Sequence, residues 1–208
     1  MVGVIALIAD RKKDRRPVAA GPGRFLTSHR LRVIAVVGLV AFVLLGAVGV
    51  ISALGPHPGD LRPGTEVPQQ FRDAITDAAH DCKRPGVTPA LIAAMLYAES
   101  GFDAGKQSPD GSEVGIAMWT PLVFAHWAPT RSDRAADPWD PYDAIAAMGP
   151  FLCELAQSVG FLRPHDPRLL IAAGYRVGGE SVRQAKGIPS SAAAYTEIVR
   201  KKLIEYGY

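Results

Sequence analysis

The chain has 208 residues, 48% of them apolar, with 23 basic and 20 acidic side chains and a formal net charge of +3. This composition is too apolar for a wholly disordered chain, and the length is sufficient for one or two folded domains. Two cysteines exclude a disulfide-dense scaffold and a four-cysteine zinc site.

The charged residues are segregated along the chain. Residues 1–32 hold eight basic and two acidic side chains, residues 33–54 hold none, and residues 55–208 hold 15 basic and 18 acidic side chains. A nucleic-acid-binding domain carries clustered basic residues, whereas the long C-terminal part of this chain is net acidic. We therefore expect no nucleic-acid partner.

Residues 33–54 predict a single transmembrane helix. Fourteen of these 22 residues are Val, Ile, Leu or Phe, and 22 helical residues span about 33 Å, enough for a bilayer core of about 30 Å. The basic arm 1–32 predicts a cytoplasmic N-terminus, so the residues from 55 onward are expected outside the cell membrane. A buried core helix and a cleaved secretory signal are the alternatives, but 22 uncharged residues favour an uncleaved anchor.

The rest of the chain predicts a linker and one helical domain. Residues 55–67 are rich in proline and glycine, which is typical of a linker. In residues 68–208, a capping side chain followed by proline marks three helix starts, at Thr88-Pro89, Asp140-Pro141 and Asp166-Pro167. Apolar residues recur at helical spacing and no segment alternates as a strand would, so the domain is predicted to be all-α.

Three residues of this domain carry further expectations. Pro150 lies inside a helical pattern and should kink that helix or divide it.

Cys82 and Cys153 each lie on an apolar helix face, and in an oxidising exterior they are expected to pair, with two free buried thiols as the alternative. The histidines are widely spaced and form no HExxH pair, so we expect no metal site.

Glu99 is an acidic residue in an apolar position. The segment Pro89–Ser100 predicts a helix ended by Gly101, and the apolar stripe that begins at Ile92 leads to position 99. Burial and the negative end of the helix dipole both disfavour an ionised carboxylate there, and so both raise its pKa. A raised pKa is typical of a general acid. The alternative is a solvated glutamate that lies one position off the stripe.

Five strings occur in one order over about 85 residues: AESGF (98–102), SPDG (108–111), GIAMWTP (115–121), DPWDPYDAI (137–145) and GYRVGGESV (174–182). Together they resemble the lytic transglycosylase family with the SLT, or goose-lysozyme-like, domain. The resemblance covers about residues 68–205 and is closest to membrane-anchored or secreted actinobacterial members. Those members share the sequence contexts of Cys82 and Cys153, which again implies a disulfide.

The resemblance implies a lysozyme-like helical fold and cleavage of the MurNAc–GlcNAc bond of peptidoglycan strands, without a cofactor, to leave a 1,6-anhydro-MurNAc end. Glu99 would be the only catalytic residue, first as acid and then as base. The substrate-binding residues would be Ser108, Gly115, Ile116, Met118 and Tyr175. Trp119 and Trp127 would either stack on sugar rings or belong to the core.

Some positions depart from the family pattern. Met118 stands where most relatives have glutamine, Arg176 replaces an asparagine, and the segment before Gly115 is one residue longer than usual. Methionine cannot make the hydrogen bonds of a glutamine. These changes leave open reduced activity, an altered glycan preference or a catalytically inactive peptidoglycan-binding module. A lysozyme-type hydrolase is a separate alternative.

Overall fold

The computed structural model describes residues 55–208, so the predicted cytoplasmic arm 1–32 and transmembrane helix 33–54 lie outside the described residues. Residues 55–208 contain α-helices and no strand, which confirms the predicted all-α class. Within this range no helix has the length and apolar character needed to cross a bilayer. The helices are α2 (Gln69–His80), α3 (Pro89–Ser100), α4 (Pro121–Trp127), α5 (Pro141–Val159), α6 (Pro167–Val177), α7 (Gly179–Ala185) and α8 (Ser190–Tyr206).

The three predicted helix starts are confirmed. Thr88, Asp140 and Asp166 each accept hydrogen bonds from backbone N–H groups in the first turn of α3, α5 and α6, and each is followed by proline. The sequence patterns did not reveal α4 and α7. Each has seven residues, which is too short for an apolar period to repeat.

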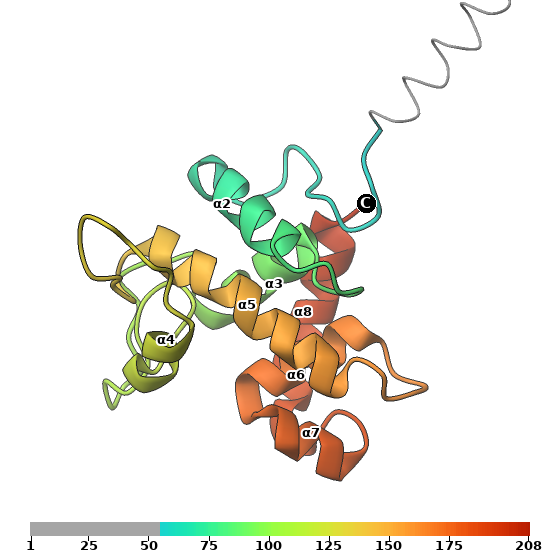
Figure 1. Cartoon of the computed structure of the whole chain (residues 1–208). Coiled ribbons are helices and arrows are strands. Elements are labelled where there is room, and N and C mark those ends of the chain that lie inside the picture. The colour runs from blue at the N-terminus through green and yellow to red at the C-terminus, as the bar shows by residue number, and fades with distance from the viewer. Residues whose placement is uncertain (1–54) are drawn as a thin grey trace, which may run out of the picture. The chain divides into compact units, whose positions relative to one another are not determined.

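Helix α3 is the centre of the core. Its first eight residues, Pro89 to Leu96, are all buried, because α3 packs against both α2 and α8. Helix α5, labelled in Figure 1, crosses the domain and packs against α2 and α6. The last turn of α3 lies beyond this enclosed stretch, and its residues are partly exposed, although the side chain of Glu99 remains buried.

Pro150 does not divide α5, which runs uninterrupted from Pro141 to Val159. Of the two expected outcomes, a kink or a division, the division is therefore wrong. A proline removes the hydrogen bond to the carbonyl four residues earlier, here that of Ala146. Pro150 is exposed and Ala146 is partly exposed, so water can bind that carbonyl and the helix continues.

The predicted linker packs on the domain over part of its length. Gly59 and Arg62 donate backbone hydrogen bonds to the carbonyls of Tyr208 and Tyr206, at 3.2 and 2.7 Å. The carbonyl of Gly59 also accepts from the N–H of Ala90 at 2.9 Å. The first turn of a helix has N–H groups without helical partners, and this contact satisfies one of them in α3.

A disulfide joins Cys82, just after α2, to Cys153 in α5. The pairing expected for an oxidising exterior is thus present in the structure. It ties the residues just after α2 to α5, and the two cysteines are 71 positions apart in the sequence.

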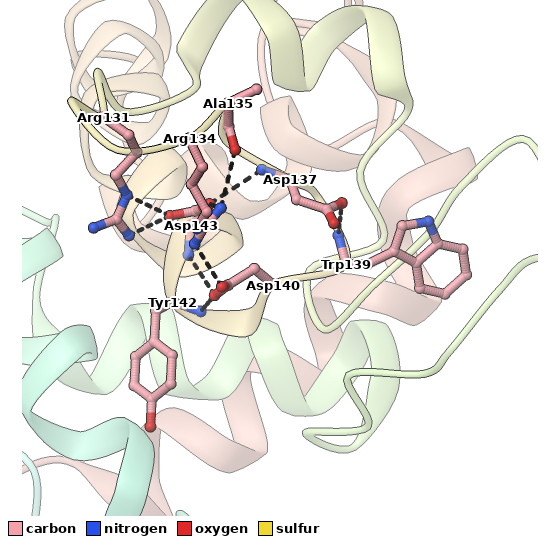
Figure 2. Close-up of polar contacts among 8 residues, drawn as sticks. All are labelled: Arg131, Arg134, Ala135, Asp137, Trp139, Asp140, Tyr142 and Asp143. Carbon is pink, nitrogen blue, oxygen red and sulfur yellow. Dashed lines mark hydrogen bonds and ion pairs between the residues drawn. The ribbon is translucent and has the colours of Figure 1, made fainter.

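The long segment between α4 and α5 is anchored by one buried carboxylate. Asp143 has a fully buried side chain, which accepts hydrogen bonds from Arg131 at 2.7 Å and from Arg134 at 2.6 Å. The backbone N–H of Asp137 donates to it at 3.1 Å. Figure 2 shows the two guanidinium groups converging on this carboxylate. The cluster fixes residues 131–137 against the start of α5.

Candidate active site

Glu99 lies in the last turn of α3, and its side chain is only 5% exposed. Gly101 ends the helix in the left-handed conformation, with φ of 66°, and its N–H donates to the carbonyl of Tyr97 at 2.9 Å. The predicted position of Glu99 on the buried face of the helix is the one found in the structure.

Burial raises the pKa of Glu99 from 4.5 to about 7. Tyr195 and the positive charge of Arg176 oppose this rise, and the negative charge of Glu113 adds to it. The direction agrees with the expectation from sequence. A carboxyl group with this pKa is present in both protonated and ionised forms near neutral pH, so it can donate a proton and then accept one.

Tyr195 is a site residue that the sequence analysis did not single out. Its hydroxyl and Oε1 of Glu99 are both buried, and neither has a hydrogen-bond partner among residues 55–208. The two groups interact closely enough to affect the pKa of both residues, but their geometry falls short of a full hydrogen bond. The sequence feature that could have identified it is the position of this tyrosine on the apolar stripe of the last helix.

Arg176 brings a positive charge to Glu99. Its Nη1 lies 3.9 Å from Oε2 of Glu99 and donates to both carboxylate oxygens of Glu113, each at 3.2 Å. Arg176 is one of the positions at which the sequence departs from the family pattern, and the structure places its charge beside Glu99. Glu113 was not expected to take part in the site.

The backbone of residues 115–118 is held by side chains from two helices. Ser100 in α3 donates to the carbonyl of Ile116 at 2.6 Å, and the Tyr175 hydroxyl in α6 donates to the carbonyl of Ala117 at 2.7 Å. The side chain of Ile116 is fully buried, so only its backbone is available for binding. Tyr175 has thus a visible role in fixing this turn.

Gly115 is required at its position because the turn contacts another loop. Its φ is 77°, and an added Cβ would lie 2.1 Å from the carbonyl oxygen of Pro138. Met118 also has a positive φ, of 49°. Two backbone hydrogen bonds between Val114 and Trp119 close the turn. The loop fixed by Asp143 therefore supports one side of residues 115–118.

Ser108 organises the turn that precedes this stretch. Its hydroxyl donates to Asp110 at 2.7 Å and accepts from the N–H of Glu113 at 2.9 Å. Its own N–H donates to the carbonyl of Glu113 at 2.9 Å. In the described domain Ser108 does not line the cavity beside the site, and its contacts set the position of Glu113.

A cavity of about 260 Å³ lies beside Arg176. Its walls combine polar and aromatic side chains, as sugar-binding surfaces require; they include Glu113, Met118, Trp119, Phe151, Tyr175 and Arg176. Glu99 itself is not part of the wall, but Arg176 contacts it at 3.9 Å. Arg176 is therefore the residue that connects the cavity wall to the buried carboxyl group.

The two tryptophans that were candidates for stacking on sugar rings have different surroundings. Trp119 is 2% exposed, and its indole N–H donates to the carbonyl of Ala144 at 3.0 Å, which places it in the core behind the cavity. Trp127 stacks on Phe151, with ring centroids 5.3 Å apart, and lines a separate hollow near Cys153. The structure thus places Trp119 where stacking on a sugar ring is restricted.

An all-helical domain with a buried glutamate at the end of its central helix has the general architecture of a lysozyme-like protein. A model of the transglycosylase SLT domain family matches residues 78–198, a range that contains Glu99, Glu113, Tyr175 and Arg176. The chain belongs to this family, whose activity is the cleavage of peptidoglycan glycan strands. Comparison with curated proteins and comparison with solved structures each found no match.

Proposed function

We propose that this protein is a lytic transglycosylase that cleaves the MurNAc–GlcNAc bond with Glu99 as its only catalytic residue. The observation that carries the proposal is the buried carboxyl group of Glu99, whose pKa of about 7 suits both acid and base. Protonated Glu99 donates its proton to the glycosidic oxygen. The resulting carboxylate then takes the proton of the MurNAc C6 hydroxyl, which attacks C1 and closes the 1,6-anhydro ring.

The hydrogen bonds of Glu113 favour attack on C1 by the C6 hydroxyl of the sugar over attack by a water molecule. Two-carboxylate glycosidases need a second carboxylate that acts as nucleophile or activates water. Glu113 is the acidic residue that shares Arg176 with Glu99, and both of its oxygens accept from Arg176. Both carboxylate oxygens of Glu113 are therefore already engaged by the guanidinium of Arg176. The second candidate is a hydrolase that uses Glu113 as its base. It would release products with reducing MurNAc ends.

The substrate contacts of this enzyme are proposed for the cavity beside Arg176. Residues 115–118 contribute mainly backbone groups. The side chain of Ile116 is buried, and the side chain of Met118 lacks the amide group that a glutamine would offer. Tyr175 lines the cavity while its hydroxyl holds Ala117. The glycan would thus lie along a rigid turn, with its scissile bond directed toward Glu99.

We further propose that the domain acts outside the cell membrane, anchored by residues 33–54. The support is the uncharged apolar segment, the basic arm that precedes it and the disulfide of the described domain. A wall-cleaving enzyme has its substrate in that compartment.

The test of the activity is mass spectrometry of peptidoglycan sacculi digested by the purified full-length protein. We expect muropeptides with 1,6-anhydro-MurNAc ends, and we expect Glu99→Gln to lower their release by at least about 100-fold, because general acid–base catalysis contributes about that much or more. Glu197→Gln is the matched control, since Glu197 is exposed on α8 and pairs with Arg200.

Two other outcomes would contradict the proposal. Products with only reducing MurNAc ends would identify a hydrolase, and Glu113→Gln should then also abolish release. Binding of sacculi without turnover would identify an inactive binding module. In that case the double change Met118→Gln and Arg176→Asn, which restores the family pattern at both positions, should produce activity.

A further inference from the structure

Glu99 is surrounded by ionisable groups from three separate parts of the domain. Tyr195 approaches from α8, Tyr175 and Arg176 belong to α6, and Glu113 lies in the turn after α3. Arg176 is the only one of these four that is a cation. Its position relative to Glu99 therefore decides how strongly the ionised form of Glu99 is stabilised.

The guanidinium of Arg176 is shared unequally between the two glutamates. Nη1 is 3.2 Å from both oxygens of Glu113 but 3.9 Å from Oε2 of Glu99, which is beyond hydrogen-bonding distance. Arg176 is 40% exposed and Glu113 is 28% exposed, so neither is held by burial. Arg176 is therefore hydrogen-bonded to Glu113 and not to Glu99.

Glu113 is itself held in place by its own turn. Its N–H donates to the hydroxyl of Ser108, and its carbonyl accepts from the N–H of Ser108, both at 2.9 Å. On the other side, Arg176 follows Tyr175, whose hydroxyl is bonded to Ala117. Both partners thus extend from backbone that the site already fixes, and the pair needs little further ordering.

We propose that Glu113 is a positioning residue that holds the Arg176 guanidinium away from Glu99, so that Glu99 stays available as a proton donor. The inference rests on the proposed function in one respect, that Glu99 is the acid. Without Glu113, the guanidinium would close the gap and form a hydrogen-bonded ion pair with Glu99. Such a pair favours the carboxylate and withdraws the acid form at neutral pH.

The two positioning variants have opposite expected effects. In Glu113→Gln the negative charge of Glu113 is lost and Arg176 turns to Glu99, and both changes lower the pKa of Glu99, together by at least about one unit. In Arg176→Asn the cation is lost, and the pKa of Glu99 should rise by about one unit. Arg176→Lys keeps the charge and should remain closer to the wild type than Arg176→Asn does.

The direct measurement is a titration of the Glu99 carboxyl group by NMR. The full-length protein is labelled with ¹³C at glutamate side-chain carboxyl groups, and the Glu99 signal is assigned by its loss in Glu99→Gln. Glu197→Gln is the matched control and should leave the Glu99 titration unchanged. Shifts of the same sign in Glu113→Gln and Arg176→Asn, or no shift in either, would overturn the proposal.

The activity measurement adds an independent readout. The alkaline limb of the pH profile of kcat/KM should move to lower pH in Glu113→Gln and to higher pH in Arg176→Asn. A purely structural role would lower the rate without moving this limb in opposite directions. If the wild type releases no product, the proposed function fails, and the NMR titration still decides whether Glu113 controls Arg176.

Discussion

At the scale of single residues, the site depends on a carboxyl group that is buried where a charge is unfavourable. Glu99 is 5% exposed, and its Oε1 has no hydrogen-bond partner among the described residues. The nearby Arg176 offsets this burial only in part, because the pKa of Glu99 still rises to about 7. The folded protein therefore contains a carboxyl group whose ionised form is unfavourable. Such groups are typical of sites where a proton is transferred.

The cost of that ionisation predicts a pH-dependent stability. Below the unfolded pKa of 4.5 Glu99 is protonated in both states, and above the folded pKa of about 7 it is ionised in both. Between these values the unfolded state ionises first, so the folded state loses stability as the pH rises, by about 3 kcal/mol in all. Glu99→Gln removes this loss.

Urea denaturation at pH 5 and pH 8 measures the effect. We expect the free energy of unfolding of Glu99→Gln, relative to wild type, to increase by about 2–3 kcal/mol between these two values. Glu197→Gln, on the exposed face of α8, should show no such increase. An equal difference at both pH values would mean that Glu99 ionises as freely as a solvated glutamate.

At the scale of elements, the helices could be predicted more completely than the loops. Capping residues and apolar spacing marked the starts of α3, α5 and α6 and the position of Glu99, because these signals are local. The contact between Arg176 and Glu113 joins residues 63 positions apart, and no local pattern records it. For the same reason the core placement of Trp119, through Ala144, was left open by the sequence.

The loop between α4 and α5 gives a prediction at this scale. Asp143→Asn leaves Arg131 and Arg134 without their buried carboxylate and places amide hydrogens against donors. We expect a loss of about 2–4 kcal/mol in the free energy of unfolding, because a broken buried ion pair costs about 3–5 kcal/mol and these arginines are partly exposed. Urea denaturation measures it.

Asp73→Asn is the matched control for this change. Asp73 is an exposed residue of α2, and its replacement should alter the free energy of unfolding by less than about 0.5 kcal/mol. If Asp143→Asn were as mild as Asp73→Asn, the two arginines would not anchor the loop. The support of Gly115 by Pro138 would then have to come from packing alone.

At the scale of the whole molecule, the proposed topology is based on the distribution of charge and on redox chemistry. The net charge of +3 combines a basic arm with a net acidic C-terminal part, so it says nothing about the surface of the catalytic domain. The disulfide between Cys82 and Cys153 is the kind of bond that persists in an oxidising exterior. The proposed topology, with the basic arm in the cytoplasm and the domain outside, accounts for both observations.

This topology predicts the labelling of two engineered cysteines in intact cells. Both native cysteines are in the disulfide, so Ser28→Cys in the basic arm and Ser132→Cys in the exposed loop before α5 each introduce one free thiol. A membrane-impermeant maleimide should label position 132 in intact cells and position 28 only after permeabilisation. Labelling of position 28 in intact cells would indicate the opposite topology. Protection of both positions in intact cells would indicate that the domain lies inside the cell. A mature chain that has lost position 28 would show that residues 33–54 act as a cleaved signal.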